Sequence, residues 1–158
     1  MRALVVYHSV FGNTEQIARA IGTGLTGRMA EVRIVPVSAL TPESIPADLL
    51  VVGGPTQRHR MSPELEALLA RYPRGSLRGV RAATFDTRYR MSRLLSGSAA
   101  ASAAARLRRA GCHLITDPES FFIERDAPAA GEKRRHGQEH LEPGEIERAT
   151  EWARRLPI

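Results

Sequence analysis

The stretch Ala3-Leu-Val-Val-Tyr-His-Ser-Val-Phe-Gly-Asn-Thr14 decides the fold, because in it an apolar run passes directly into a short polar turn. The unbroken apolar character of Ala3–Tyr7 is typical of a strand that is buried on both faces. A helix is expected to begin at Asn13 or Thr14. Its apolar stripe repeats at helical spacing and consists of Ile17, Ala18, Ile21 and Leu25. The segment therefore predicts a strand, a turn and a helix in immediate succession.

The turn Ser9–Thr14 is a candidate phosphate site because of its position between a strand and a helix. The first N–H groups of a helix are unpaired and carry a partial positive charge, so an anion can bind there without lysine or arginine. The hydroxyls of Ser9 and Thr14 and the amide of Asn13 can add donors. Gly12 allows the main chain to turn close to the anion. An ordinary helix cap at Asn13 or Thr14 is the alternative interpretation.

Strand-like and helical patterns alternate along the rest of the chain. The strand-like runs are Ala3–Tyr7, Val32–Val37, Leu49–Val52, Arg81–Phe85 and His113–Ile123, the last interrupted by Asp117-Pro118. Further helices are expected from Ser62-Pro63 to near Tyr72, over Ser98–Ala110, and along an inner face of Ile146, Ala149, Ala153 and Leu156. Alternation of this kind predicts a parallel sheet covered by helices. One domain over residues 1–158 is expected from the length.

The run Val5–Thr14 resembles the phosphate loop of the flavodoxin family, in which a strand is followed by S/T-x-x-G-N-T. The resemblance implies an α/β, flavodoxin-like fold: a doubly wound, five-stranded parallel sheet in the order 2-1-3-4-5 with helices on both faces. It also implies that a single FMN binds at the carboxyl edge of the sheet, where strands 1 and 3 diverge. The alternation described above extends over nearly the whole chain in a compatible order.

The same resemblance implies that two further loops border the FMN, one after the third strand (Gly53–Arg60) and one after the fourth (Phe85–Tyr89). Thr56 is the best polar contact in the first. Tyr89 is the candidate to cover one face of the flavin, with packing on a helix as its alternative. For Asp86, capping of the turn is the alternative to a contact with the flavin. The residues predicted to bind the cofactor are Ser9, Val10, Phe11, Gly12, Asn13, Thr14, Pro55, Thr56, Gln57, Arg58, His59, Asp86, Thr87, Arg88 and Tyr89.

In the flavodoxin family, the loop after the third strand often supplies an aromatic residue and a glycine. In this chain His59 is the only flat ring in that loop, and Gln57–Arg60 contains no glycine. Arg58, Arg60 and Arg88 would stabilise an anionic reduced flavin. A guanidinium about 6 Å from the charged ring contributes roughly 3 kcal/mol at an effective dielectric near 20, and less after solvent screening. The reduced flavin is therefore predicted to form more easily than in acidic flavodoxins.

Several other motifs are weaker. The glycines of Gly22-Thr-Gly24-Leu-Thr-Gly27 satisfy the dinucleotide fingerprint formally, but they come at the end of the first helix, where glycine is a stop signal. His136 and His140 have no evident third metal ligand. Cys112 is expected to be buried and inert at the start of a strand, and Trp152 is interpreted as a packing residue. No residue is predicted to be catalytic or to bind a metal.

The net charge of +6 suits an acidic partner or a phosphate-bearing ligand, although biased base composition is an equally good explanation, since Lys133 is the only lysine. No specific nucleic-acid contact is indicated. A single cysteine and the lack of a long apolar segment favour a cytoplasmic protein without membrane contact.

Three functions remain open from the sequence. The favoured one is an FMN-binding electron carrier with a redox partner protein, in which no side chain is catalytic. The second is an oxidoreductase that passes hydride from NAD(P)H through FMN to a quinone or a similar small acceptor. In that case the basic run Lys133–His136, within a long loop expected over Glu124–Glu142, would clamp the nucleotide; a solvated charge run is the alternative. The third is a flavin-free binding or regulatory module.

Overall fold

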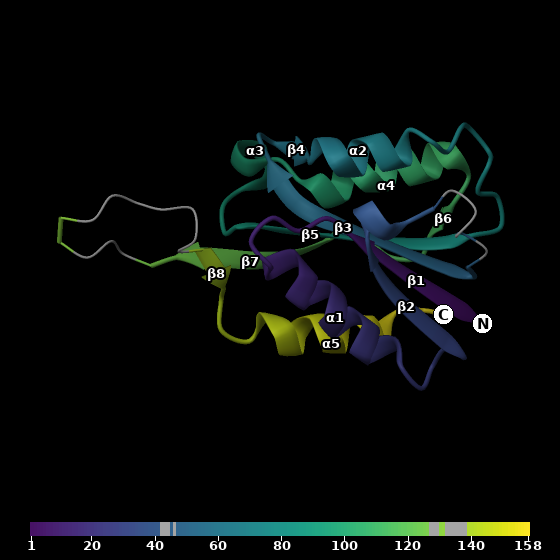
Figure 1. Cartoon of the computed structure of the whole chain (residues 1–158), viewed down its shortest axis with the longest axis horizontal. Helices are drawn as coiled ribbons and strands as arrows, with labels where there is room; N and C mark the ends of the chain where they lie inside the picture. Colours follow the sequence, from purple (N-terminus) through teal and green to yellow (C-terminus); the bar gives the residue numbers. More distant parts are fainter. Residues whose placement is uncertain (42–44, 46, 127–129, 132–138) are drawn as a thin grey trace.

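The computed structural model describes residues 1–41, 45, 47–126, 130–131 and 139–158. Its centre is a mostly parallel sheet in the order β2-β1-β3-β5-β7-β8 (Figure 1). The parallel strands are β1 Arg2–Tyr7, β2 Glu31–Pro36, β3 Leu49–Gln57, β5 Arg81–Tyr89, β6 His113–Leu114 and β7 Glu119–Arg125. β6 and β7 both pair with β5 and are the two halves of the predicted fifth strand, interrupted around Asp117-Pro118. The parallel strands thus follow the predicted order 2-1-3-4-5.

Two antiparallel strands extend this sheet, and both correct the sequence prediction. β3 does not end at Val52 but continues to Gln57 and turns back into β4 (Arg60–Met61), so most of the expected loop Gly53–Arg60 is a hairpin. The expected long loop Glu124–Glu142 has paired ends, because β8 (Glu139–Leu141) lies antiparallel to β7. The run Lys133–His136 lies outside the described residues.

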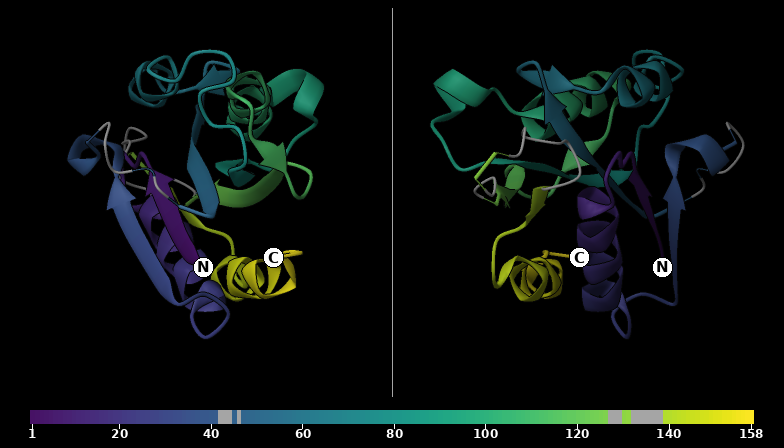
Figure 2. Two further views of the ribbon diagram at one scale, coloured as in Figure 1. Left: turned by 90° about the vertical axis from the view of Figure 1, so that its right-hand side faces the viewer. Right: turned by 60° about the vertical axis from the view of Figure 1, so that its left-hand side comes forward.

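Helices cover both faces of the sheet, as predicted (Figure 2). They are α1 Asn13–Leu25, α2 Pro63–Leu69, α3 Arg93–Ser96, α4 Ala99–Ala110 and α5 Glu145–Arg155, with a 3-10 turn η1 at Val37–Ala39. α1 and α5 pack on the face formed by residues such as Val5, Val51 and Phe85. α2 and α4 pack on the opposite face, on alternate residues such as Val6 and Val52. The period of two along the strands therefore divides the core into two layers.

The structure of the first helix shows that the interpretation of its glycines as stop signals was wrong. Gly22 and Gly24 lie inside α1 and are buried, so they do not stop the helix. A Cβ at Gly22 would lie 2.3 Å from Ile34 Cδ1 of β2, and one at Gly24 would lie 2.3 Å from the Thr150 carbonyl of α5. These glycines are needed for close packing, and the helix ends just after them, at Leu25.

The last helix confirms most of the predicted inner face. Ala149, Ala153 and Leu156 are buried, and Trp152 packs edge-on against Phe121, 6.0 Å between ring centroids, in the packing role expected of it. Ile146, expected on the same face, is 42% exposed, and its neighbour Glu145 is buried instead. Among the described residues, the helices include none that is long and apolar enough to cross a bilayer.

Candidate functional site

The turn between β1 and α1 is shaped by its main chain. Gly12 has a φ of 90° and stands at the N-cap of α1. The Ser9 hydroxyl accepts hydrogen bonds from the N–H groups of Gly12, at 3.1 Å, and of Glu15, at 3.3 Å. No atom would lie within 4 Å of a Cβ at Gly12, so glycine is required there for its left-handed conformation and not for space. A small oxygen already fits among these N–H groups, and the turn therefore suits a phosphate oxygen.

The other polar residues of the turn reach outward to neighbouring strands. Thr14 is buried, and its hydroxyl lies 2.8 Å from the hydroxyl of Thr87 on β5. The Asn13 side-chain amide donates to the main-chain carbonyl of Glu139 on β8 at 3.3 Å. Val10 and Phe11 are half exposed. The turn is thus tied to two strands, while its apolar side chains face solvent.

The end of β3 brings Thr56 and the hairpin turn to the same edge of the sheet. The Thr56 hydroxyl donates to the Asp86 carboxylate at 3.2 Å and accepts from the Ala99 N–H at 2.9 Å. Arg58 and His59 have φ values of 47° and 71°, which identifies a two-residue hairpin turn in the left-handed region. Both side chains are exposed. A residue with a Cβ atom costs the fold about 1–2 kcal/mol of stability in such a conformation.

Phe85–Tyr89 was expected to be a loop, but these residues continue β5. The segment pairs in parallel with β7 along its whole length, and Phe85, Asp86 and Thr87 also pair with β3. Pairing on both sides together with burial of Phe85, Asp86 and Thr87 keeps the chain extended. The predicted site residues at the end of β5 therefore lie within the sheet, where their side chains have fixed partners.

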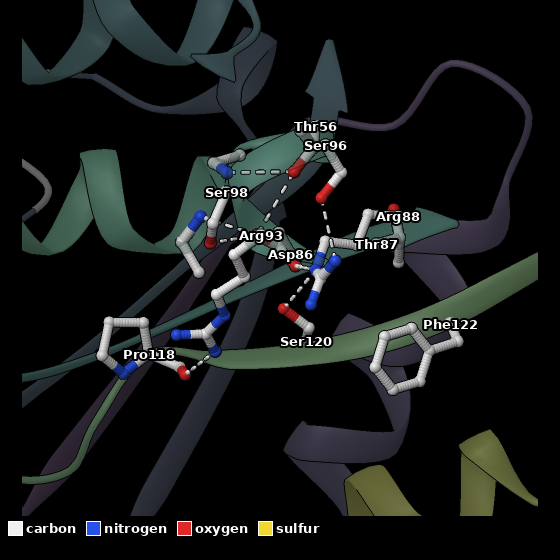
Figure 3. A network of polar contacts seen from close by, with 12 residues as sticks. Thr56, Asp86, Thr87, Arg88, Arg93, Ser96, Ser98, Pro118, Ser120 and Phe122 are labelled. Carbon is white, nitrogen blue, oxygen red and sulfur yellow. Dashed lines mark hydrogen bonds and ion pairs between the residues drawn. The ribbon is translucent and has the colours of Figure 1, made fainter. Parts of the chain in front are cut away.

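A buried polar network centres on Asp86, which has no exposed surface (Figure 3). Its Oδ2 atom accepts hydrogen bonds from the Ser98 hydroxyl at 2.7 Å and from the Ala100 N–H at 3.0 Å, in addition to the one from Thr56. Ser98 is the N-cap of α4 and also accepts from the Ala101 N–H. Asp86 therefore fixes the start of α4 to the ends of β3 and β5.

Arg88 is the buried cation of this network (Figure 3). Its guanidinium donates to the Ser120 hydroxyl at 2.9 Å, to the Ser96 hydroxyl at 2.9 Å and to the Met91 carbonyl at 2.8 Å. It lies 3.9 Å from Asp86 Oδ1. The charge of Arg88 is thus held by protein groups, so any effect of free positive charge on a flavin rests on the exposed Arg58 and Arg60.

Tyr89 is half-buried and shares an acceptor with Arg125. Its hydroxyl donates to Glu139 Oε1, and Arg125 donates to the same oxygen at 2.6 Å. The Arg125 guanidinium lies 5.8 Å from the centroid of the Tyr89 ring. Burial, followed by the hydrogen bond to Glu139, raises the pKa of the Tyr89 hydroxyl. Glu139 joins the ring of Tyr89 to the turn after β1, because its carbonyl also accepts from Asn13.

Sequence reasoning did not identify Ser98, Ser120 or Glu139 as parts of this site. Ser98 had a usable signal, since it precedes the alanine-rich helix at a capping position. The other two had none. Cys112 is buried, and burial raises the pKa of its thiol to about 11, in agreement with the inert role predicted for it. No group of three potential metal ligands occurs within the described part of the chain.

Comparisons with known proteins agree with this architecture. A family model described as a flavodoxin domain matches residues 4–93. An uncharacterised protein of Methanocaldococcus jannaschii is 32% identical over 74 residues, which is 44% of this chain but 19% of that protein, so the match spans about a fifth of the relative.

Solved structures of the same fold cover nearly all of the chain. An archaeal flavodoxin superposes with a TM-score of 0.72 at 20% identity, over 99% of this chain and 96% of its own. Flavodoxin 1 of Bacillus cereus gives 0.70 at 13% identity, over 97% and 95%. The flavodiiron protein of Giardia intestinalis gives 0.73 at 17% identity, over 98% of this chain and 35% of its own. At these identities the likeness establishes the fold.

Proposed function

The chain belongs to the flavodoxin domain family, and on this premise we propose that it binds FMN and transfers electrons. The observation that carries the proposal is the turn after β1, in which Gly12 adopts a left-handed conformation and the Ser9 hydroxyl already lies among main-chain N–H groups. Such a turn at a helix start binds an anion through its main chain. FMN differs from riboflavin by one phosphate, so this turn would select FMN.

The residues proposed to hold the cofactor fall into two groups. Ser9–Thr14 would bind the phosphate, and the ends of β3 and β5, with Pro55–His59 and Asp86–Tyr89, would border the ring. Bound FMN would supply the redox chemistry, because it can accept and release electrons singly or in pairs. The protein side chains would orient the flavin and shield it from water. None of them needs to transfer a proton, and none is proposed as catalytic.

A redox partner protein is proposed to dock beside this site. Leu94, Leu95 and Met91 are 96%, 68% and 48% exposed, and they follow the carboxyl end of β5, the edge that also holds the turn after β1 (Figure 1). Exposed apolar residues that gather in this way favour a protein contact. The exposed Arg58 and Arg60 lie nearby, because His59 between them pairs with Gly97 at the end of α3. The partner is therefore proposed to present an acidic surface with an apolar centre.

Flavin titration tests the cofactor. Purified protein is titrated with FMN and, as the matched ligand without a phosphate, with riboflavin, and binding is followed by quenching of flavin fluorescence. FMN is expected to bind at least about tenfold more tightly, since a phosphate that accepts several hydrogen bonds contributes more than about 1.4 kcal/mol. A protein that ignores both compounds would exclude a flavin function. Equal affinity would exclude the turn as the phosphate site.

An NAD(P)H-dependent oxidoreductase is the second candidate, and its enzymatic turnover distinguishes it from a carrier. FMN-loaded protein is mixed with NADPH or NADH and a water-soluble quinone, and the loss of nucleotide absorbance is recorded. A carrier without its partner is expected to leave the nucleotide unchanged. Steady consumption that requires both FMN and quinone would replace the carrier proposal with the enzymatic one. A cytoplasmic location is proposed for either function, since a lone cysteine cannot form an internal disulfide.

A further inference from the structure

α2 and α4 lie on the sheet face opposite to α1 and α5 (Figure 1, Figure 2). Residues of both helices line a basic groove. Three hollows of about 700, 360 and 260 Å³ follow one another along it. The first and second share Arg60, Met61 and Glu66, and the second and third share Arg106 and Arg109. The hollows therefore form one continuous groove, which begins at the β3–β4 hairpin turn.

Arginines from separate elements converge in the middle hollow. Ser102, Ala105, Arg106 and Arg109 recur at i, i+3, i+4 and i+7 of α4, so they line one side of that helix. Arg60 enters from β4. Three long basic side chains thus line one hollow together with the smaller Ser102 and Ala105.

The positive charge of the middle hollow is only partly balanced. Glu66 pairs with Arg106 at 3.1 Å. Neither Arg60 nor Arg109 forms an ion pair with any residue in the described ranges, and both side chains are exposed. The third hollow adds Arg74. Cations that outnumber the carboxylates beside them repel one another, and a bound anion would relieve this repulsion.

We propose that this groove binds a ligand with two or more phosphate groups, held in the middle hollow by Arg60, Arg106 and Arg109. A guanidinium donates two parallel N–H bonds to a phosphate, and arginine suits this geometry better than lysine. The larger hollow beside Gln57 and Arg58 leaves room for the rest of such a ligand, within the size range of small-molecule sites. The phosphate-binding part of the groove shares no residue with the proposed FMN site, and only Gln57 and Arg58 at the hairpin end belong to both.

Calorimetric titration of the FMN-loaded protein with pyrophosphate tests the site. Arg109→Ala is the test variant and Arg108→Ala the matched control, because Arg108 is an exposed arginine on the same helix that lines none of the three hollows. Binding is expected to weaken about tenfold in Arg109→Ala and less than about twofold in Arg108→Ala. Absence of binding, or equal losses in the two variants, would overturn the proposal. The same thermal unfolding midpoint in both variants would confirm that they are folded.

A second set of titrations separates this site from the FMN site and identifies the source of the phosphates. Gly12→Ala is expected to retain pyrophosphate binding, and its loss in that variant would assign the anion to the turn after β1 and overturn the groove. NADPH and NADH are then compared. Tighter binding of NADPH would assign the groove to a 2′-phosphorylated nucleotide, whereas equal binding would assign it to the shared pyrophosphate. Binding of pyrophosphate without either nucleotide would leave a free polyphosphate as the ligand; each of these three results supports the phosphate chemistry.

Discussion

The turn after β1 and the end of β5 border the same edge of the sheet, but they keep their shape by different means. The turn depends on the main chain, with Gly12 in the left-handed region and N–H groups that donate to a single serine oxygen. The end of β5 depends on buried side chains, among which Asp86 and Arg88 have fixed partners on several elements. The difference implies that substitutions at β5 mainly reduce stability, whereas substitutions in the turn mainly reduce anion binding.

The largest effect is expected from Asp86→Ala. The substitution removes the acceptor of the Thr56 hydroxyl, the Ser98 hydroxyl and the Ala100 N–H, and it leaves the buried Arg88 guanidinium without its nearest carboxylate. Removal of one partner from a buried charged pair costs about 3–5 kcal/mol. Urea unfolding measures this loss. Ser98→Ala, which removes one donor and the cap of α4, is the control and should cost only about 1 kcal/mol.

If Asp86→Ala and Ser98→Ala lower the free energy of unfolding equally, Asp86 is not the centre of the network. If instead Asp86→Ala keeps its stability and loses FMN, Asp86 is a direct ligand of the flavin. That result would remove the proposed contrast between the two regions.

Low pH is expected to lower the stability of the protein at β7, the strand beside β5, because it protonates the Glu145 carboxylate. Burial by itself acts to raise the pKa of this carboxyl, but hydrogen bonds from Arg148 and from the Phe122 N–H on β7 outweigh it, so the pKa lies below its ordinary value of 4.5. The stabilisation is therefore complete above the ordinary pKa and is lost as the pH falls through the lowered one.

Glu145→Gln tests this linkage. A hydrogen bond to a charged group contributes about 1.5–3 kcal/mol, which the variant should lose near neutral pH. Urea midpoints of both proteins are compared between about pH 6 and pH 3. The difference between them should shrink toward the acid end. A constant difference would show that the Glu145 charge does not contribute, and the end of β7 would then be held by neutral contacts alone.

The parallel core of the fold was predictable because it depends on period and alternation. Unbroken apolar runs such as Leu49–Val52 identify strands that are buried on both faces. The ends of these strands were not predictable, because Gly53, Gly54 and Pro55 have the composition of a loop. Gly53 belongs to a strand because the Phe85 ring occupies the space of its missing side chain, 2.2 Å from where a Cβ would lie. Such a tertiary fit leaves no local signal.

The candidate site likewise has a part that could be predicted from the sequence and a part that could not. Ser9–Thr14 was recognisable because strand, turn and helix are contiguous, and Gly12 does have a left-handed conformation at the start of α1. The binding of phosphate by this turn stays a prediction. Glu139 could not be found, since it reaches Asn13 and Tyr89 only through the pairing of β8 with β7. Arg88 was recognised as a charge near the ring, but its guanidinium is held by Ser96 and Ser120, which lie outside the motif.

Gly12→Ala tests the main-chain side of the comparison. A φ of 90° costs a residue with a Cβ about 1–2 kcal/mol, even though the space beside Gly12 is open. The turn should relax toward another conformation, and FMN should bind about tenfold more weakly or worse. Gly27→Ala is the matched control, because Gly27 has a φ of 86° and open space at the far end of α1. It should lose similar stability and keep its FMN affinity; loss of affinity in both variants would attribute the effect to stability alone.

The smallest effect is expected at the contact that joins the two regions, the 2.8 Å hydrogen bond between the hydroxyls of Thr14 and Thr87. Thr14→Val, Thr87→Val and the double variant form a cycle in the free energy of unfolding, with an expected coupling of about 1 kcal/mol. Thr84 provides the control, since its buried hydroxyl donates instead to the Ala100 carbonyl, and Thr84→Val should be additive with Thr14→Val. A Thr14–Thr87 coupling close to zero would mean that the turn and the end of β5 are independent. With the expected coupling, Thr87→Val should also weaken FMN binding slightly, because the hydroxyl that orients Thr14 in the turn would be gone.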